Sequence, residues 1–151
     1  MKNNNGFTLI EVLLVIAILA ILAGIVIIAI NPQKQVASAR DAQRSSDVYA
    51  ILSAVHQYAV DHEGELPGNL SEDYCEICRT TSDSCIGLCD LSALTINEEY
   101  LVSMPIDPLC PIDGAYCDDN GTGYTIQVTE NGRIRVNAPD VELRDEIVAE
   151  Q

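Results

Sequence analysis

The sequence predicts an α+β fold in which a long N-terminal helix packs on a small antiparallel sheet in a disulfide-stabilised head. Three observations carry this prediction. The segment Val12–Ile30 contains 19 residues without a charge, two short segments alternate in polarity around an Asn-Gly pair, and all six cysteines lie between residues 75 and 117. A chain of 151 residues allows one modest domain in addition to such a helix.

The N-terminal helix carries an unexpected acid. Val12–Ile30 is long enough to cross a hydrocarbon core of roughly 30 Å, at about 1.5 Å per helical residue. Glu11 lies at its start, where a carboxylate costs about 2.5 to 3.5 kcal/mol on membrane-insertion scales, so we expect this group to find a partner. A partner arises if the chain is cut after Gly6, because Phe7 then offers a free amine.

The block Gly6-Phe7-Thr8-Leu9-Ile10-Glu11, followed by the apolar run, resembles the N-terminal signature of type IV pilins and of the pseudopilins of type II secretion. The resemblance implies a leader at residues 1–6, a cut after Gly6 by a prepilin peptidase, and methylation of the new Phe7 amine. It also implies that Glu11 aligns subunits and neutralises a neighbour's amine. A secretory signal has an apolar region of only about 7 to 15 residues, and a plain anchor leaves Glu11 unexplained.

The resemblance implies a structural subunit rather than an enzyme. A type IV pilin is held in the bacterial inner membrane, here through residues 7–30, in contact with lipid. A platform and an ATPase then assemble it into a homo-oligomeric helical filament, the extracellular pilus (fimbrium). A pseudopilin shares these motifs, and a membrane-anchored binding module that never polymerises is a further alternative. The chain shows no Ser/His/Asp set and no phosphate loop, so we expect no catalytic residues.

Charge bears on partners and on orientation. The net charge is −15, and 19 of the 23 acids lie from Glu63 onward, which argues against direct nucleic-acid binding because phosphates are repelled. Only Lys2 precedes the apolar run, whereas Lys34, Arg40 and Arg44 follow it, and this distribution favours a cytoplasmic C-terminus. The pilin-like motif and the cysteines, which need an oxidising compartment, favour the opposite orientation, with the C-terminus outside.

Residues 31–63 are predicted to form an amphipathic second helical segment. Pro32 lacks the amide proton and clashes with the preceding turn, so we expect a kink or local melting just before it. Gly24 is a second soft point, and pili of the family that the chain resembles are often unwound between such a Gly and Pro. A simple break between two helices at Asn31-Pro32 fits equally well.

The second half of this segment carries an apolar stripe suited to lie on a sheet, with residues recurring at three- and four-residue spacing. The helix is expected to end at Gly64 and Pro67. The stripe comprises Val48, Ile51, Leu52, Val55 and Ala59, with Tyr58 beside them.

The first half, Gln33–Asp47, is mostly small or polar. We expect these residues to be solvated in a free subunit and to let neighbouring helices approach in a filament. Arg44 lies three residues after Asp41 and three before Asp47, so both pairs can form along the helix and stabilise it by a few tenths of a kcal/mol each.

The head, residues 64–151, is predicted to begin irregularly. Gly68–Leu109 shows no strand pattern, although Leu91–Leu101 has the composition of a short helix. Met104-Pro105-Ile106-Asp107-Pro108 looks like the L-P-x-D-P segment that pseudopilin-like proteins carry before their sheet. Its two prolines favour an extended, turn-rich conformation.

A hairpin follows near the C-terminus. Gly123–Val128 and Arg133–Val136 alternate as strands, and the turn Thr129–Gly132 between them contains the strong Asn-Gly signal. A third strand is predicted around Val141–Ile147, where helical composition competes.

The cysteines are expected to form three disulfides, because the count is even and an exported head with one Phe and no Trp has a small core. Spacing favours a local loop closed by Cys110 and Cys117, and a nested arrangement of the other four, although spacing does not fix connectivity. Zinc is the competing hypothesis for C-x-x-C…C-x-x-x-C, but it needs a reducing compartment. The favoured pairs are Cys75–Cys89, Cys78–Cys85 and Cys110–Cys117.

Asp118, Asp119 and Asn120, beside Gly121, form a weak calcium candidate, since some pseudopilins bind calcium in C-terminal loops. The twelve-residue calcium pattern with its closing Glu is absent, so a plain turn is favoured and no cofactor is expected. His56 and His62 are six residues apart and do not form a ligand pair.

Overall fold

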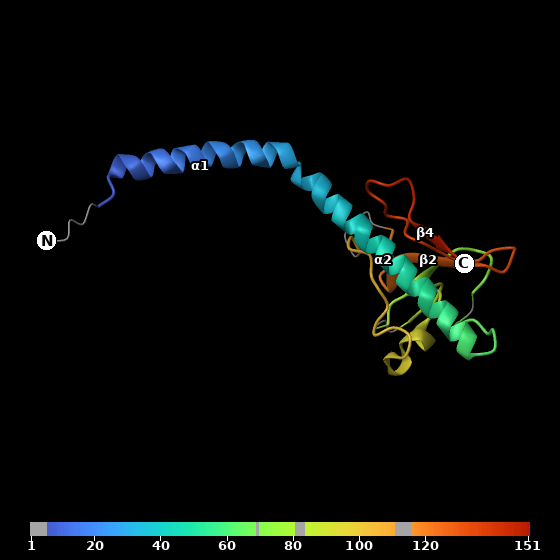
Figure 1. The fold of residues 1–151 in the computed structure, drawn as a ribbon. Coiled ribbons are helices and arrows are strands. Elements are labelled where there is room, and N and C mark those ends of the chain that lie inside the picture. Colours follow the sequence, from blue (N-terminus) through green and yellow to red (C-terminus); the bar gives the residue numbers. More distant parts are fainter. Residues whose placement is uncertain (1–5, 69, 81–83, 111–115) are drawn as a thin grey trace. The chain divides into compact units, whose positions relative to one another are not determined.

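The structure is a computed structural model of the chain, shown in Figure 1, and describes residues 6–68, 70–80, 84–110 and 116–151. It divides into two compact units, Met1–Val36 and Ala37–Gln151, which are considered separately below.

Helix α1 spans Leu9–Ile30 and continues without interruption through Gly24. Thr8 caps its N-terminus with an extended backbone, and the Thr8 hydroxyl accepts a hydrogen bond from the Glu11 amide at 3.4 Å. None of the 22 residues is buried. The helix is long and apolar enough to cross a membrane, in agreement with the predicted apolar span.

The helical run breaks at Asn31, whose backbone is left-handed with φ 46°. Asn31 ends α1 and also caps the next helix, because its backbone oxygen accepts from the Lys34 amide at 3.1 Å and its side chain accepts from the same amide at 3.4 Å. Pro32 is the first residue of α2, a position that needs no amide donor. The break is therefore a junction between two helices.

Helix α2 spans Pro32–Asp61. Its buried face begins at Ala37, so most of the helix belongs to the second compact unit. The chain turns away at Glu63 and Gly64, which both have positive φ, and the Gly64 amide donates to the Ala59 carbonyl at 2.7 Å.

Four antiparallel strands form one sheet in the order β1-β2-β3-β4. A turn closed by a 2.8 Å bond from the Gly132 amide to the Thr129 carbonyl joins the two central strands. The strands are β1 (Cys75–Cys78), β2 (Gly121–Val128), β3 (Ile134–Asn137) and β4 (Val148–Glu150).

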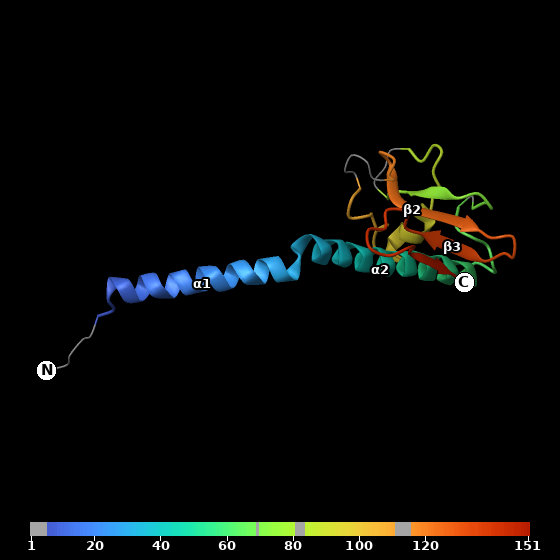
Figure 2. The same cartoon turned by 90° about the horizontal axis from the view of Figure 1, so that it is seen from above.

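The core lies between α2 and the sheet, which run side by side in Figure 2. Val48, Ile51 and Val55 on α2 pack in the same buried cluster as Ile126 and Val136 on the central strands, and all five are fully buried. The predicted apolar stripe of α2 therefore does lie on the sheet.

Two predictions about the head are wrong in detail. The cysteine-rich segment contains a strand, β1, which its sequence does not predict, whereas the short helix predicted within Leu91–Leu101 is present as the 3-10 helix η1, Ser92–Glu98, interrupted at Ile96 and Asn97. The last strand is β4, which starts at Val148, whereas the predicted third strand, Val141–Ile147, has no regular structure. Polar residues of this segment contact α2 instead, as described below.

Candidate functional site

The residues predicted to direct processing lie together at the start of α1. Phe7, Glu11, Val12, Val15 and Ile16 line one apolar hollow on the helix surface. Phe7 is 81% exposed and lies just before the first residue of the helix. Glu11 thus lines the same hollow as Phe7, the residue whose amine would be released by a cut after Gly6.

Gly6 is the first residue that the structure describes. It is exposed, and a Cβ built on it would meet no atom within 4 Å. Within the described residues no ion pair is recorded for Glu11. In the described part of a single subunit, Glu11 therefore has no internal counter-charge.

A second constellation, buried in the head, is centred on Arg44 of α2. The Arg44 guanidinium donates to both carboxylate oxygens of Asp107, at 2.6 and 3.1 Å, and to Asp41 at 2.9 Å. The side chains of Arg44 and Asp107 are both 0% exposed. A buried, two-pronged pair of this kind fixes α2 to the segment that precedes β2.

Asp41 extends the constellation to the irregular residues before β4. Its carboxylate accepts from the Glu142 amide at 3.1 Å and from the Leu143 amide at 2.8 Å. The Glu142 carboxylate in turn accepts from Arg40 at 2.5 and 2.6 Å and from Arg44 at 3.1 Å. One helical turn of α2 therefore holds two distant segments of the head.

These contacts shift the pKa values of the charged groups. Hydrogen bonds from Arg40 lower the pKa of Glu142, although its partial burial opposes the shift. Burial alone would raise the pKa of Asp41, but the Glu142 and Leu143 amides and Arg44 outweigh it and lower that pKa. Burial likewise opposes the charged form of Arg44, and the bonds to Asp107 and Glu142 raise its pKa. All three groups are therefore held in their charged forms.

Asp47 has a different role from the one predicted. It accepts from the side-chain amide of Gln43 at 2.7 Å and from the Tyr124 hydroxyl at 2.8 Å, so it bonds to β2 and not to Arg44. Burial, followed by the bond to Asp47, raises the pKa of Tyr124. Of the two pairs predicted along the helix, Asp41–Arg44 is confirmed and Arg44–Asp47 is wrong.

The prediction that the first half of α2 is solvated is also wrong for three of its five charged residues. Asp41, Arg44 and Asp47 are buried, at 1%, 0% and 8% exposure. The sequence signal that could have indicated this is Asp107 between two prolines, an acid in a rigid segment that requires a base. Nothing in the sequence identifies Arg44 as that base, because the two residues are 63 positions apart.

The head contains disulfides, as the cysteine count predicts. The structure pairs Cys75 with Cys89, Cys78 with Cys85, and Cys110 with Cys117, which are the pairs that spacing favours. Paired sulfurs offer no thiolate ligand for zinc. Among the described residues, no group of three or more His, Cys, Asp or Glu side chains is placed to hold a metal.

The loop of the calcium candidate is joined to β1 by internal hydrogen bonds. The Glu76 carboxylate of β1 accepts from the Gly123 amide at 2.8 Å and from the Asp118 amide at 3.1 and 3.2 Å. The Asn120 amide bonds the Asp118 side chain at 3.2 Å, which closes an ordinary Asx turn. The loop thus turns amide donors toward an internal anion.

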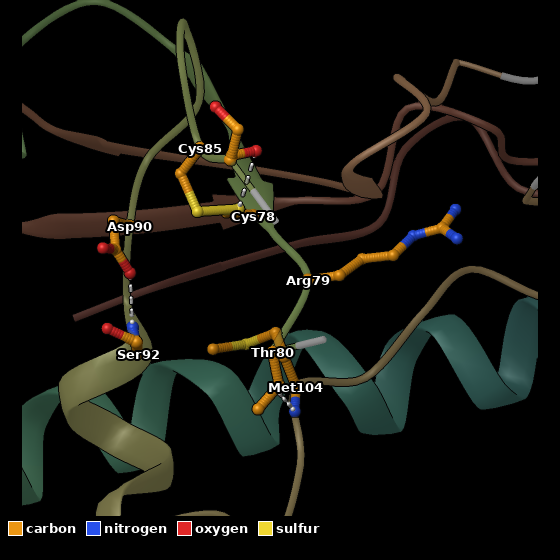
Figure 3. A pocket seen from close by; sticks show the side chains of 8 residues that line it. Cys78, Arg79, Thr80, Cys85, Asp90, Ser92 and Met104 are labelled. Carbon is orange, nitrogen blue, oxygen red and sulfur yellow. Dashed lines mark hydrogen bonds between the residues drawn. A yellow bond between two sulfur atoms is a disulfide. The ribbon is translucent and has the colours of Figure 1, made fainter. Parts of the chain in front are cut away.

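A polar cavity of about 310 Å³ lies beside the Cys78–Cys85 disulfide (Figure 3). On its wall the Thr80 hydroxyl accepts from the Met104 amide at 3.0 Å, and Asp90 accepts from the Ser92 amide at 2.9 Å. These polar groups tie loops together. The neighbouring residues 81–83 lie outside the described part of the chain.

The C-terminal end of α2 carries a small aromatic cluster. His62 stacks on Tyr58 with ring centroids 3.9 Å apart, and Tyr100 meets Tyr58 edge-on at 5.5 Å. Burial, the hydrogen bond to Asp61 and nearby acids raise the pKa of Tyr100 to about 12. His62 is exposed and His56 is half-buried, so the two histidines form no joint site.

Comparison with known families identifies the N-terminal segment. Residues 1–27 match the family model described as the prokaryotic N-terminal methylation motif. A search of the curated proteins and a search of the solved structures gave no match. The motif is consistent with the type IV pilin and pseudopilin family, which is structural rather than enzymatic. It supports a pilin- or pseudopilin-like precursor and implies processing by a prepilin peptidase and assembly into pilus-like oligomers.

Proposed function

We propose that this chain is a type IV pilin precursor, cut after Gly6, anchored in the inner membrane and polymerised through its N-terminal helix into an extracellular filament. The methylation motif at residues 1–27 carries the proposal. In this proposal residues 1–6 are the leader that is removed, and the apolar helix that follows carries Glu11 in its first turn.

The exposed surface of α1 supports polymerisation. The large apolar side chains of α1 are between 49% and 85% exposed, and no residue of the helix is buried. Such a surface needs a non-aqueous partner. Lipid provides it before assembly, and the same helix of neighbouring subunits provides it in the filament.

Glu11 supports a specific register between subunits. A carboxylate in the first turn of an apolar helix loses hydration free energy when that helix is buried, unless the carboxylate meets a counter-charge. In the proposed filament that charge is the Phe7 amine of a neighbour, which exists only after the leader is removed. A prepilin peptidase that also methylates this amine, an assembly platform and an ATPase are the partners of this pathway.

The test compares Glu11→Ala with Glu130→Ala, in which an exposed acid of the hairpin turn is removed. Both variants should appear in the membrane fraction in the amount of the wild type. Glu11→Ala should abolish filaments seen by electron microscopy, whereas Glu130→Ala should keep them. Abundant normal filaments from Glu11→Ala would refute the role of Glu11.

Filament length, protein export and intact mass distinguish the alternative functions. A pseudopilin would form only short assemblies and would be required for export of other proteins. A membrane-anchored binding module would remain monomeric, and its leader would stay attached, which intact-mass measurement detects.

A further inference from the structure

Residues 139–146, between β3 and β4, form a loop that is closed at its base. The Ala138 amide donates to the Ile147 carbonyl at 3.0 Å, and both of these residues are buried, at 1% and 4% exposure. The loop itself leaves the sheet and contacts α2. We call residues 139–146 the strap.

Polar contacts hold the strap. Two backbone amides of the strap, those of Glu142 and Leu143, donate to the Asp41 carboxylate. The Glu142 carboxylate accepts from Arg40 and Arg44. Outside α2, Asp140 accepts from the Tyr116 amide at 2.7 Å, and Glu146 lies 3.9 Å from Arg135.

Little apolar surface of the strap is buried. Leu143 is 47% exposed, and Val141 is the strap residue that packs against the hydrophobic core. Segments with few apolar contacts open at lower free energy than the sheet that carries them. The base at Ala138 and Ile147 can stay paired while the strap lifts.

We propose that the strap opens and closes on α2 as a local unit, and that its closed state fixes the turn Ala37–Asp41 of α2 to the head. When the strap opens, Asp41 loses two amide donors and Arg40 loses its carboxylate. Arg44 loses Glu142 but keeps its bonds to Asp107 and Asp41, so α2 remains attached to the head from Asp41 onward.

The strap thereby sets the length of helix that is free to join other subunits. This part rests on the proposed function. The compact head begins at Ala37 when the strap is closed. Release of residues 37–40 adds four residues, or about 6 Å of helix, to the free segment.

Residue-resolved hydrogen exchange on the full chain in detergent tests the opening. The Leu143 amide reports on the strap, the Asp41 amide on the helical turn, and the Ala138 amide on the base. In Glu142→Gln, exchange at Leu143 should rise about tenfold, since charge-assisted bonds are lost, and exchange at Asp41 should rise with it. Exchange at Ala138 should not change. The matched control is Glu130→Gln, which should behave as the wild type.

Three results would overturn the proposal. Unchanged exchange at Leu143 in Glu142→Gln would show that the strap does not open alone. An equal rise at Ala138 would show that the whole edge of the sheet opens. A rise at Leu143 without one at Asp41 would show that the strap does not hold the helix.

Filaments test the consequence for assembly. Glu142→Gln should change the yield or the subunit rise of the filament, and Glu130→Gln should not. Filaments of Glu142→Gln with normal yield and rise would overturn the link to free helix length. If the wild type forms no filaments, the proposed function fails, whereas the exchange results still decide whether the strap opens.

Discussion

Arg44 and Asp107 are 63 positions apart, and two N–H···O bonds of 2.6 and 3.1 Å join them in the interior of the head. The pair links the helical part of the chain to the segment that leads into the sheet. The Asp107 amide also donates to the Thr122 carbonyl at 2.8 Å, and its carboxylate accepts from the Leu109 amide at 2.8 Å. The backbone and the side chain of Asp107 are therefore both held by bonds other than those to Arg44.

Asp107→Asn should strongly destabilise the head. The substitution leaves the buried Arg44 charge with an incomplete set of acceptors, and loss of one partner of a buried pair costs about 3 to 5 kcal/mol. Denaturant unfolding of the full chain in detergent measures the free energy of unfolding. The control is Glu146→Gln, which removes an exposed pair with Arg135 and should cost less than about 1 kcal/mol. Equal, small effects of both substitutions would contradict the importance of the buried pair.

Stability should fall with acid in a way that depends on Glu142. Its pKa is lower in the folded chain than in the unfolded chain, so the unfolded state binds more protons as the pH falls. The stabilisation from Glu142 is complete above its unfolded pKa and is lost as pH falls through its folded pKa. The difference in unfolding free energy between the wild type and Glu142→Gln should therefore be largest near pH 7 and should shrink toward pH 3. A difference that is constant with pH would contradict this assignment.

Two glycines with similar backbones should respond differently to alanine. Gly68 and Gly132 have φ of 72° and 74°, so both substitutions place a side chain in the left-handed region, at about 1 kcal/mol. At Gly68 the new Cβ would also collide with the Asp90 carbonyl oxygen, whereas at Gly132 it would meet no atom within 4 Å. Gly68→Ala should therefore lower the melting temperature clearly more than Gly132→Ala. Similar shifts for both would show that the loop at Asp90 yields without cost.

The native protein should contain no free thiol. Three disulfides make its mass six hydrogens lighter than that of the reduced chain. Intact-mass measurement should find this deficit together with an N-terminus at methylated Phe7. Reaction with a thiol reagent before denaturation, or a mass that retains zinc, would contradict the pairing.

Loss of the pair that encloses the longer loop should cost more than loss of the nested pair. Cys75 and Cys89 are 14 positions apart, whereas Cys78 and Cys85 are 7 apart. In the chain-entropy account a loop of 15 residues is worth about 3 kcal/mol and a shorter loop is worth less. Urea unfolding of the two double-serine variants compares them directly. A larger loss for the Cys78/Cys85 variant would contradict the entropic ranking.

The sequence was sufficient to predict the two helices and the hairpin, because each is encoded by a pattern of neighbouring residues. The uncharged run after Glu11 predicts α1, the three- and four-residue spacing from Val48 predicts the buried face of α2, and the Asn131-Gly132 turn predicts the hairpin. Each signal lies within one element, so no knowledge of distant partners is needed.

The missed features all depend on distant partners. Strand β1 has only four residues, and its place in the sheet follows from pairing with β2 and from disulfides at both of its ends. Asp41 and Arg44 have the sequence appearance of a solvated helix surface, and their burial depends on Asp107 and Glu142. Glu76 fills the loop that resembles a calcium site, and no local pattern connects the two.

The internal pairing of Arg40 and Arg44 with carboxylates has an electrochemical consequence. The pairs hold two of the chain's eight basic groups inside the subunit, so these groups are not available to the acids of a neighbouring subunit, and the proposed removal of residues 1–6 would take away Lys2 as well. The net charge of the chain is −15, so each subunit of the proposed filament would add a large negative charge and the polymer would be a polyelectrolyte. Mobile counterions would accumulate along this polymer and screen the repulsion between subunits, so the free energy of adding a subunit would depend on the ionic strength of the medium.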